Sequence, residues 1–528
     1  MLDLGSDVVT PWKKRIMRQR FGALVLATAV GVASAPAAIR PDRYGALYAS
    51  HETARFELPA NAVSWRVLDV DGVVRGGGRT SGTALALDGP AVGNRLGAFR
   101  LAVALSDGQT NETWFARLSS RKVAPCPWVG TGTHGSHGWD RGDLRFVDLM
   151  AAAGIGVVRD EAYWDNVEKA KGSYVLPPAL DAYLDRLAMH GIRMNLVLDY
   201  GNRLYENPLD PEAFSKYCAW IARRLKGRVG TFEIWNEPQN FGFSRRYHVK
   251  GASEFDWIDK FVELTHLADD AIRTAAPNTT VAVAAEDWDK YLNVMLQRGI
   301  ARAHNVVTFH PYCHFQHRPE REYFLHDFGR RQRELAKANG GADRWAVTEA
   351  GWTTFEGKGE FWEVAGVYPR ASFSGQASCI VRMYLSALEA GCEYACQYDF
   401  MNDGDNSSSA EDNFGLVFRD GSPKPSFAAV ANLTRVLEAA TFADELSTDT
   451  KSYRVARFLR TGTPVLAMWA IEGEVEIDVP AEMRGGTVVD LFGNMENLPE
   501  GGKIRLAERP VYVVGVPSET WRMWRMRD

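Results

Sequence analysis

The stretch TFEIWNEPQNF, from Thr231 to Phe241, decides the fold, together with its counterpart WAVTEAGW, from Trp345 to Trp352. Each is a short run of apolar, β-branched and aromatic residues that carries a carboxylate at its end. Such a run is typical of a buried parallel strand whose C-terminal end delivers a side chain into a pocket. Glu237 and Glu349 are therefore the two candidate catalytic carboxylates, provided that the fold brings them together.

Similar strand-like runs alternate with amphipathic helical patterns through the middle of the chain. The runs cover residues 128–135, 156–164, 193–201, 230–238, 279–288, 305–313, 344–352 and 393–400. Eight strand and helix units predict a (β/α)8 TIM barrel, in which right-handed crossovers place the C-terminal ends of all strands on one face. A doubly wound open sheet is the alternative topology, but it usually carries a glycine-rich phosphate-binding turn, and the sequence contains none.

The pattern differs on both sides of this region, where short alternating segments are separated by turn dipeptides such as Asp71-Gly72 and Asp107-Gly108. These features are typical of β-sandwiches. The sequence therefore predicts an N-terminal β-sandwich over 39–124, a catalytic barrel over 125–440 and a C-terminal β-sandwich over 441–528. The N-terminal sandwich carries no cluster of titratable groups, so we expect an accessory role in packing or sugar binding.

Residues 1–38 have the organisation of an extension followed by a signal peptide. Positive charge at Met17 to Arg20 precedes an apolar run from Phe21 to Val32, and the small residues at 33–38 suit a cleavage site. The apolar run is shorter than the roughly 20 residues that a membrane-spanning helix needs, so a retained anchor is the weaker interpretation. We expect a secreted or periplasmic protein with no membrane span in the mature chain.

Composition excludes several classes of partner. The 528 residues are 46% apolar and 24% charged, the formal net charge is -5, and charges of one sign form no long blocks. Binding to nucleic acid or to an anionic membrane is therefore not expected. The chain has six Cys residues, several in apolar runs, so buried free thiols are the default and at most one or two disulfides are expected.

Barrel topology predicts that Glu237 and Glu349 lie in the same pocket. Strands four and seven lie across the barrel from one another, so Glu237 and Glu349 would face each other over the same pocket. Two carboxylates about 5 Å apart are the arrangement of a retaining glycosidase, in which one attacks the anomeric carbon and the other transfers the proton.

These motifs resemble a known group of enzymes. Asn236-Glu237-Pro238 at the fourth strand and Thr348-Glu349 at the seventh look like the clan A glycoside hydrolases. The run from Trp164 to Asp181, followed by a helix and the WNEP motif, is similar to glycoside hydrolase family 39 and its relatives from bacterial exopolysaccharide loci. The resemblance covers about 128–437. Clan A barrels commonly end strand eight with a Trp, whereas this chain has Tyr398-Asp399 there, so a simple xylosidase is not implied.

The resemblance also implies roles for individual residues. Glu237 would be the general acid/base and Glu349 the nucleophile, while Asn236 would bind the sugar 2-hydroxyl. His310 and Tyr312 resemble the residues that orient the nucleophile, and Arg159 resembles the arginine that keeps it ionised. Further candidates for the lining of the sugar pocket are His134, Trp164, Tyr200, Trp288, Trp352 and Tyr398.

Several His and Cys residues raise the question of a metal. His310, Cys313, His314 and His317 lie within eight residues, and His134 and His137 lie just after the first strand. Zinc uses such ligands, but the spacing suits a helix rather than the end of a strand, and a glycosidase of this class needs no metal. We therefore expect neither a metal nor another cofactor.

The sequence thus predicts a retaining glycoside hydrolase that cleaves a poly- or oligosaccharide through a covalent glycosyl-enzyme intermediate. A transglycosidase on the same scaffold and a carbohydrate-binding barrel without activity are the alternatives. The sugar, its linkage, endo or exo action and the oligomeric state stay open.

Overall fold

The computed structural model of the chain describes residues 38–137, 143–240, 242–286, 289–312, 318–320, 326–356, 370–478, 485–499 and 502–515. Residues 1–37 of the predicted signal segment lie outside these ranges, as do Trp288, Cys313, His314 and His317. Ile39–Asp528 forms one compact unit.

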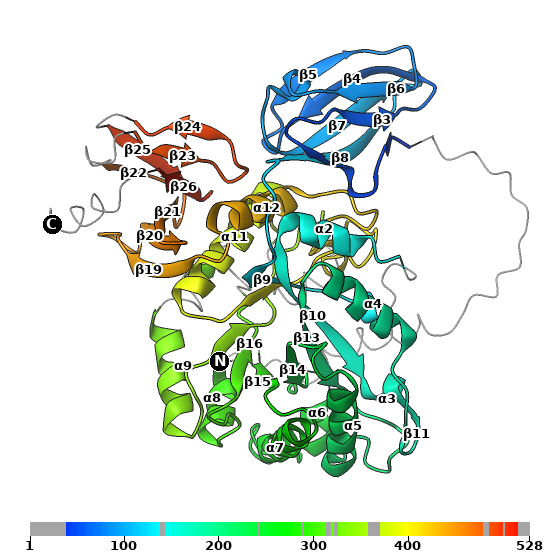
Figure 1. Cartoon of the computed structure of the whole chain (residues 1–528), viewed down its shortest axis with the longest axis vertical. Helices are drawn as coiled ribbons and strands as arrows, with labels where there is room; N and C mark the ends of the chain where they lie inside the picture. The colour runs from blue at the N-terminus through cyan, green and yellow to red at the C-terminus, as the bar shows by residue number, and fades with distance from the viewer. Residues whose placement is uncertain are drawn as a thin grey trace, which may run out of the picture. The chain divides into compact units, whose positions relative to one another are not determined.

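Eight parallel strands close into a barrel (Figure 1). In order around the barrel they are β9 (Cys126–Gly132), β10 (Ile155–Tyr163), β13 (Arg193–Asp199), β14 (Thr231–Ile234), β15 (Thr280–Glu286), β16 (Val306–Phe309), β17 (Trp345–Val347) and β18 (Ala395–Gln397). Each overlaps one of the eight predicted runs, and β18 pairs in parallel with β9 to complete the ring. The predicted TIM barrel is confirmed.

The helices that return the chain between strands have conventional ends. Asp210 caps α5, where its side chain accepts a hydrogen bond from the Ala213 amide and Pro211 occupies the first turn. Ser372 caps α11 in the same way through the Gly375 amide. The helices are α2 (Phe146–Ala153), α3 (Trp164–Val167), α4 (Pro178–Met189), α5 (Pro211–Arg224), α6 (Phe243–Tyr247), α7 (Ile258–Ala275), α8 (Asp289–Gln297), α9 (His326–Ala338), α11 (Phe373–Glu389) and α12 (Pro425–Leu437).

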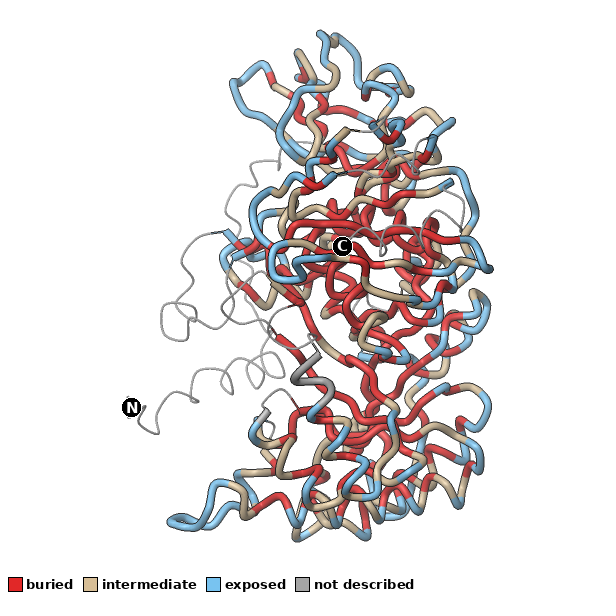
Figure 2. The backbone as a smooth tube through the Cα atoms, turned by 90° about the vertical axis from the view of Figure 1, so that its left-hand side faces the viewer, coloured by how far each residue is buried: buried red, intermediate tan, exposed pale blue. Residues whose placement is uncertain are grey.

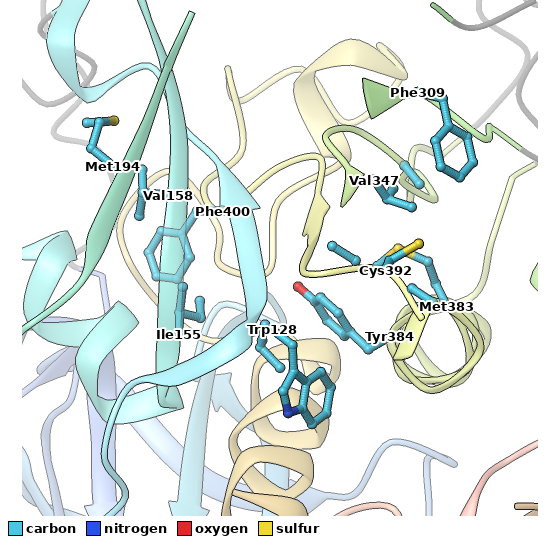
Figure 3. Packing of buried hydrophobic residues seen from close by; sticks show 14 of the residues in the cluster. Trp128, Ile155, Val158, Met194, Phe309, Val347, Met383, Tyr384, Cys392 and Phe400 are labelled. Atoms are coloured by element: carbon cyan, nitrogen blue, oxygen red, sulfur yellow. The ribbon is translucent and has the colours of Figure 1, made fainter. Parts of the chain in front are cut away.

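The barrel strands and these helices enclose a large apolar core. Strands such as β14 and β16 are buried at every position because both faces are covered. Figure 3 shows part of this packing, with Val158 of β10, Val347 of β17 and Tyr384 of α11 among the buried side chains. In Figure 2 the buried residues gather in the interior and the exposed ones lie on the outer loops.

Sheets on both sides of the barrel in the chain agree with the predicted β regions. Before it, a five-stranded and a three-stranded sheet are formed by β1 (Arg40–Pro41), β2 (Leu47–Ala49), β3 (Ala54–Glu57), β4 (Ala62–Leu68), β5 (Val74–Arg79), β6 (Ala84–Leu87), β7 (Gly97–Leu105) and β8 (Thr110–Leu118). After it, a six-stranded and a two-stranded sheet are formed by β19 (Thr441–Glu445), β20 (Tyr453–Arg460), β21 (Thr463–Ala470), β22 (Glu474–Asp478), β23 (Thr487–Val489), β24 (Met495–Asn497), β25 (Lys503–Ala507) and β26 (Val511–Val514). A small hairpin of β11 (Glu168–Ala170) and β12 (Ser173–Tyr174) follows α3.

The terminal sheets share buried contacts with the barrel. Arg382 of α11 forms a buried ion pair with Glu320, and Glu320 also accepts a hydrogen bond from the Trp469 indole of β21 at 2.6 Å. Because Ile39–Asp528 packs as one unit, the domain limits near residues 124 and 440 stay a prediction.

Two smaller expectations concern cysteines and the membrane. Five of the six Cys are described, and all five are buried free thiols, namely Cys126, Cys218, Cys379, Cys392 and Cys396. Among the described residues, no helix combines the length and the apolar character that crossing a membrane requires.

Candidate active site

The two candidate carboxylates meet at the C-terminal ends of the barrel strands. Glu237 follows β14 and Glu349 follows β17, and one carboxylate oxygen of each lies within 4.8 Å of the other and of a ring nitrogen of His310. The backbone leaves β14 through two left-handed residues, Trp235 at φ 68° and Glu237 at φ 42°. Such a conformation is costly for residues other than glycine and is found mostly at functional sites.

Glu349 is held by two donors. The Arg159 guanidinium of β10 forms an ion pair with Oε1, and the Tyr312 hydroxyl donates to Oε2 at 3.0 Å. His310 Nδ1 lies farther away, at 3.7 Å from Oε2. The Glu349 side chain is only 12% exposed, so these contacts fix its orientation and neutralise part of its charge.

Arg159 connects Glu349 to the fourth strand. Its Nε donates to Glu233 Oε2 at 2.8 Å, and its Nη2 donates to Asn236 Oδ1 at 2.8 Å. Burial lowers the pKa of Arg159, but the charges of Glu233 and Glu349 raise it well above its ordinary value. The guanidinium therefore stays charged between two carboxylates.

Glu237 has a different environment. Its Oε1 lies 2.8 Å from His310 Nδ1, and its Oε2 accepts a hydrogen bond from Asn240 Nδ2 at 3.1 Å. Burial raises the pKa of Glu237 to about 7, although Asn240 and Arg159 act in the opposite direction. A carboxyl group with such a pKa can give and accept a proton near neutral pH.

Asn236 and Tyr200 lie beside this pair. Asn236 Nδ2 donates to the Tyr200 hydroxyl at 3.1 Å, and that hydroxyl donates to Glu161 Oε1 at 3.1 Å. Asn236 is thus bonded on one side to Arg159 and on the other to Tyr200, which fixes the direction of its amide.

A second polar group lies where β18 meets β9. The Tyr398 hydroxyl donates to Asp403 Oδ2 at 3.3 Å and lies 3.4 Å from His134 Nε2. Glu411 is a further acidic residue in this region. Burial and the charges of Asp403, Glu349 and Glu237 raise its pKa to about 8. The charges of the two candidate catalytic residues therefore act on Glu411.

The structure does not place every sequence-predicted residue at this site. Trp164 is fully buried, and its indole donates to Glu168 Oε2 at 2.6 Å, so a supporting role for it stays a prediction. It packs against Phe214 and Tyr217 of α5. Trp352 is 3% exposed and belongs to the apolar core, which leaves almost no face for a sugar. Trp288 lies outside the described residues.

His310 also differs from its expected partner. The resemblance assigned it to orientation of Glu349, whereas its closest carboxylate contact is with Glu237, and its Nε2 lies 3.1 Å from Thr348 Oγ1. Tyr312 does contact Glu349. The two residues of one strand end therefore serve different carboxylates.

Sequence reasoning missed three acidic residues, Glu161, Glu233 and Glu411. Glu233 is fully buried and accepts hydrogen bonds from Asn195 and Thr308, both at 2.8 Å. Its position four residues before Glu237 in the same apolar strand was a usable signal, because a carboxylate inside a buried strand needs a charged partner. Glu161 and Glu411 had no comparable signal.

Comparisons with known proteins agree with the barrel fold. Residues 119–358, somewhat less than half of the chain, match the family model described as Cellulase (glycosyl hydrolase family 5). No curated protein matches the chain.

Similar solved structures include a family 39 glycoside hydrolase from the gut symbiont Bacteroides cellulosilyticus WH2, which is 20% identical, with 91% of this chain and 100% of that chain covered and a TM-score of 0.73. A monomeric beta-xylosidase from Caulobacter crescentus CB15 is 16% identical, with 76% and 99% covered and a TM-score of 0.50. A glucosidase from Croceicoccus marinus is 12% identical, with 75% and 97% covered and a TM-score of 0.51.

At these identities the solved structures establish the fold, while the family model identifies the class of enzyme. Together with the closed eight-stranded barrel, they identify the chain as a glycosidase of the clan A type.

Proposed function

We propose that the chain is a retaining glycoside hydrolase, which cleaves a poly- or oligosaccharide by double displacement. One observation carries the proposal: carboxylate oxygens of Glu237 and Glu349 lie within 4.8 Å of each other. Retaining enzymes hold their carboxyl groups about 5 to 5.5 Å apart, whereas inverting enzymes need about 6.5 to 9.5 Å to admit a water molecule.

In the first step Glu349 is the nucleophile. Its carboxylate attacks the anomeric carbon and forms a glycosyl ester, while Glu237 donates its proton to the departing glycosidic oxygen. Arg159 and Tyr312 hold Glu349 through one oxygen each, which keeps the nucleophile in a single orientation. The pKa of about 7 lets Glu237 carry the required proton at neutral pH.

In the second step Glu237 is the base. It takes a proton from a water molecule, whose oxygen attacks the anomeric carbon and releases Glu349 as a free carboxylate. The sugar thus leaves with its original anomeric configuration, because two inversions have occurred. Asn236 would bind the sugar 2-hydroxyl, since Arg159 and Tyr200 already fix its amide.

The protein would act outside the cytoplasm, in the periplasm or after secretion. This part of the proposal rests on the charged, apolar and small segments of residues 17–38. N-terminal sequencing of the mature protein, recovered from a bacterial host, tests it. A start near residue 36 or 39 supports export with cleavage, and an intact N-terminus contradicts it.

The catalytic proposal is tested by Glu349→Ala. Hydrolysis of an aryl glycoside, chosen by screening a panel of sugars, should be abolished. Added azide should restore turnover and give a glycosyl azide of inverted configuration, because the small anion replaces the missing nucleophile. Glu356→Ala is the matched control, since Glu356 is an exposed carboxylate seven positions along the chain. Near-normal activity of Glu349→Ala would show that the nucleophile is another residue.

A further inference from the structure

Asp399 is a buried carboxylate with no assigned role. It follows β18, its side chain is fully buried, and neither carboxylate oxygen has a hydrogen-bond partner among the described residues. An ionised carboxylate in such a place costs several kcal/mol unless a cation or a set of donors compensates it. A carboxyl group in such a place therefore either takes up a proton or binds a cation.

Two other ligand-bearing side chains converge on Asp399. One ring nitrogen of His134, one oxygen of Asp403 and one oxygen of Asp399 all lie within 4.8 Å of one another. His134 Nε2 is 3.8 Å from Asp403 Oδ1, and the two side chains are 29% and 26% exposed. The group thus has one fully buried member and two members that solvent can reach.

The charge of Lys424 acts on Asp399, but its amino group donates to other partners. Lys424 Nζ donates to Thr354 Oγ1 at 3.0 Å and to the Asn413 carbonyl oxygen at 2.9 Å. Neither oxygen of Asp399 accepts a hydrogen bond from it. Asp399 thus has no hydrogen-bond donor at either of its carboxylate oxygens within the described part of the chain.

The candidate catalytic group differs in this respect. Glu237, His310 and Glu349 are equally close together, but Arg159 and Tyr312 already occupy the oxygens of Glu349, and His310 is paired with Glu237. A metal ion there would compete with an arginine charge. No such charge contacts Asp399.

We propose that His134, Asp399 and Asp403 bind one divalent metal ion of the zinc type. One imidazole and two carboxylates match the ligands of Zn²⁺, whereas Ca²⁺ prefers oxygen ligands alone. The ion would join the end of β9 to the segment after β18, and it would lie beside Tyr398, whose hydroxyl contacts both Asp403 and His134. The site would stabilise the wall of the pocket and take no part in bond cleavage.

Titration of Zn²⁺ into the full chain tests the proposal, with a chain that carries no histidine tag and has been treated with a chelator. Calorimetry should give one tight site per chain, and the Co²⁺-loaded protein should show a visible absorption band of a tetrahedral site. Asp399→Asn keeps the side-chain shape, and His134→Gln alters a partly exposed position. Each should weaken zinc binding by about 100-fold or more, because even changes outside the ligand shell cost about 10 to 100-fold.

Two controls separate this site from other sites on the chain. His248→Gln removes the imidazole of another His–Asp pair, in which Nδ1 lies 2.8 Å from Asp256, and Glu349→Gln alters the candidate catalytic group. Both variants should keep the tight site and the cobalt spectrum. The proposal is overturned if the wild-type chain binds no zinc tightly, if Asp399→Asn and His134→Gln retain the site, or if a control loses it.

Discussion

Replacement of Glu237 by Gln tests the origin of its proton-transfer role. Burial raises the pKa of Glu237 from its ordinary value of 4.5 to about 7, which corresponds to about 3 kcal/mol against the charged carboxylate. The wild-type rate should therefore fall as pH rises through about 7, because Glu237 then loses the proton that the leaving group needs. Removing a general acid of this kind lowers the rate by about 10² to 10⁴-fold.

The assay is the pH dependence of kcat/KM with two aryl glycosides of one sugar. With a phenyl leaving group, kcat/KM of Glu237→Gln should fall by the full amount, about 10² to 10⁴-fold. With a dinitrophenyl leaving group, which needs no proton, the first step should survive, and the limb near pH 7 should disappear. Glu263→Gln, at an exposed position paired with Lys260, is the control and should keep the wild-type profile.

The same shift has a consequence for stability. The pKa of Glu237 is raised in the folded state. Its contribution to the free energy of unfolding is therefore fully present below pH 4.5 and is lost as pH rises through about 7. Glu237→Gln does not titrate, so its melting temperature should increase relative to the wild type between pH 5 and pH 8. The reasoning is refuted if the difference in melting temperature between the two proteins does not change with pH and if Glu237→Gln keeps the alkaline limb of the kcat/KM profile.

Other substitutions test the supporting contacts. Tyr312→Phe removes the 3.0 Å hydrogen bond to Glu349 and should lower kcat about tenfold or more. The free energy of unfolding should fall by no more than about 1.5 to 3 kcal/mol, which is what a hydrogen bond to a charged group contributes. Arg159→Ala leaves two carboxylates without their cation and should cost about 3 to 5 kcal/mol in chemical unfolding; a loss below 1 kcal/mol would contradict the buried ion-pair network. Glu320→Gln weakens the buried pair with Arg382 and should lower the melting temperature of the whole chain, whereas a separate early transition of the C-terminal sheets would show that they unfold independently.

The sequence predicted the eight strands because both of their faces are buried, and that leaves long apolar runs. It also located Glu237 and Glu349, since each follows such a run. Arg159 lies in the middle of β10 and was indicated by the resemblance. Trp164, which is fully buried, has the same sequence signal as a pocket residue. Its ring packs against Phe214 and Tyr217 and its indole donates to Glu168, and the apolar pattern reveals neither contact.

The contacts between side chains were harder to predict than their positions. Whether His310 bonds to Glu237 or to Glu349 depends on the stagger of neighbouring strands, and a single sequence does not contain that information. The contacts of Glu233 were equally hard to predict. Its partner Asn195 comes from β13 and its partner Thr308 from β16, which are separate strands of the barrel. Asp399 was noted only as a departure from a Trp, while its convergence with His134 depends on β18 closing against β9.

The configuration of the first-formed product tests the central claim most directly. Proton NMR of the anomeric region, recorded within minutes of adding enzyme to an aryl glycoside, detects the product before mutarotation. Carboxylate oxygens within 4.8 Å predict that the first sugar released has the anomeric configuration of the substrate. If the opposite anomer appears first, Glu349 does not form a covalent intermediate, and the assignment of the two glutamates must be abandoned.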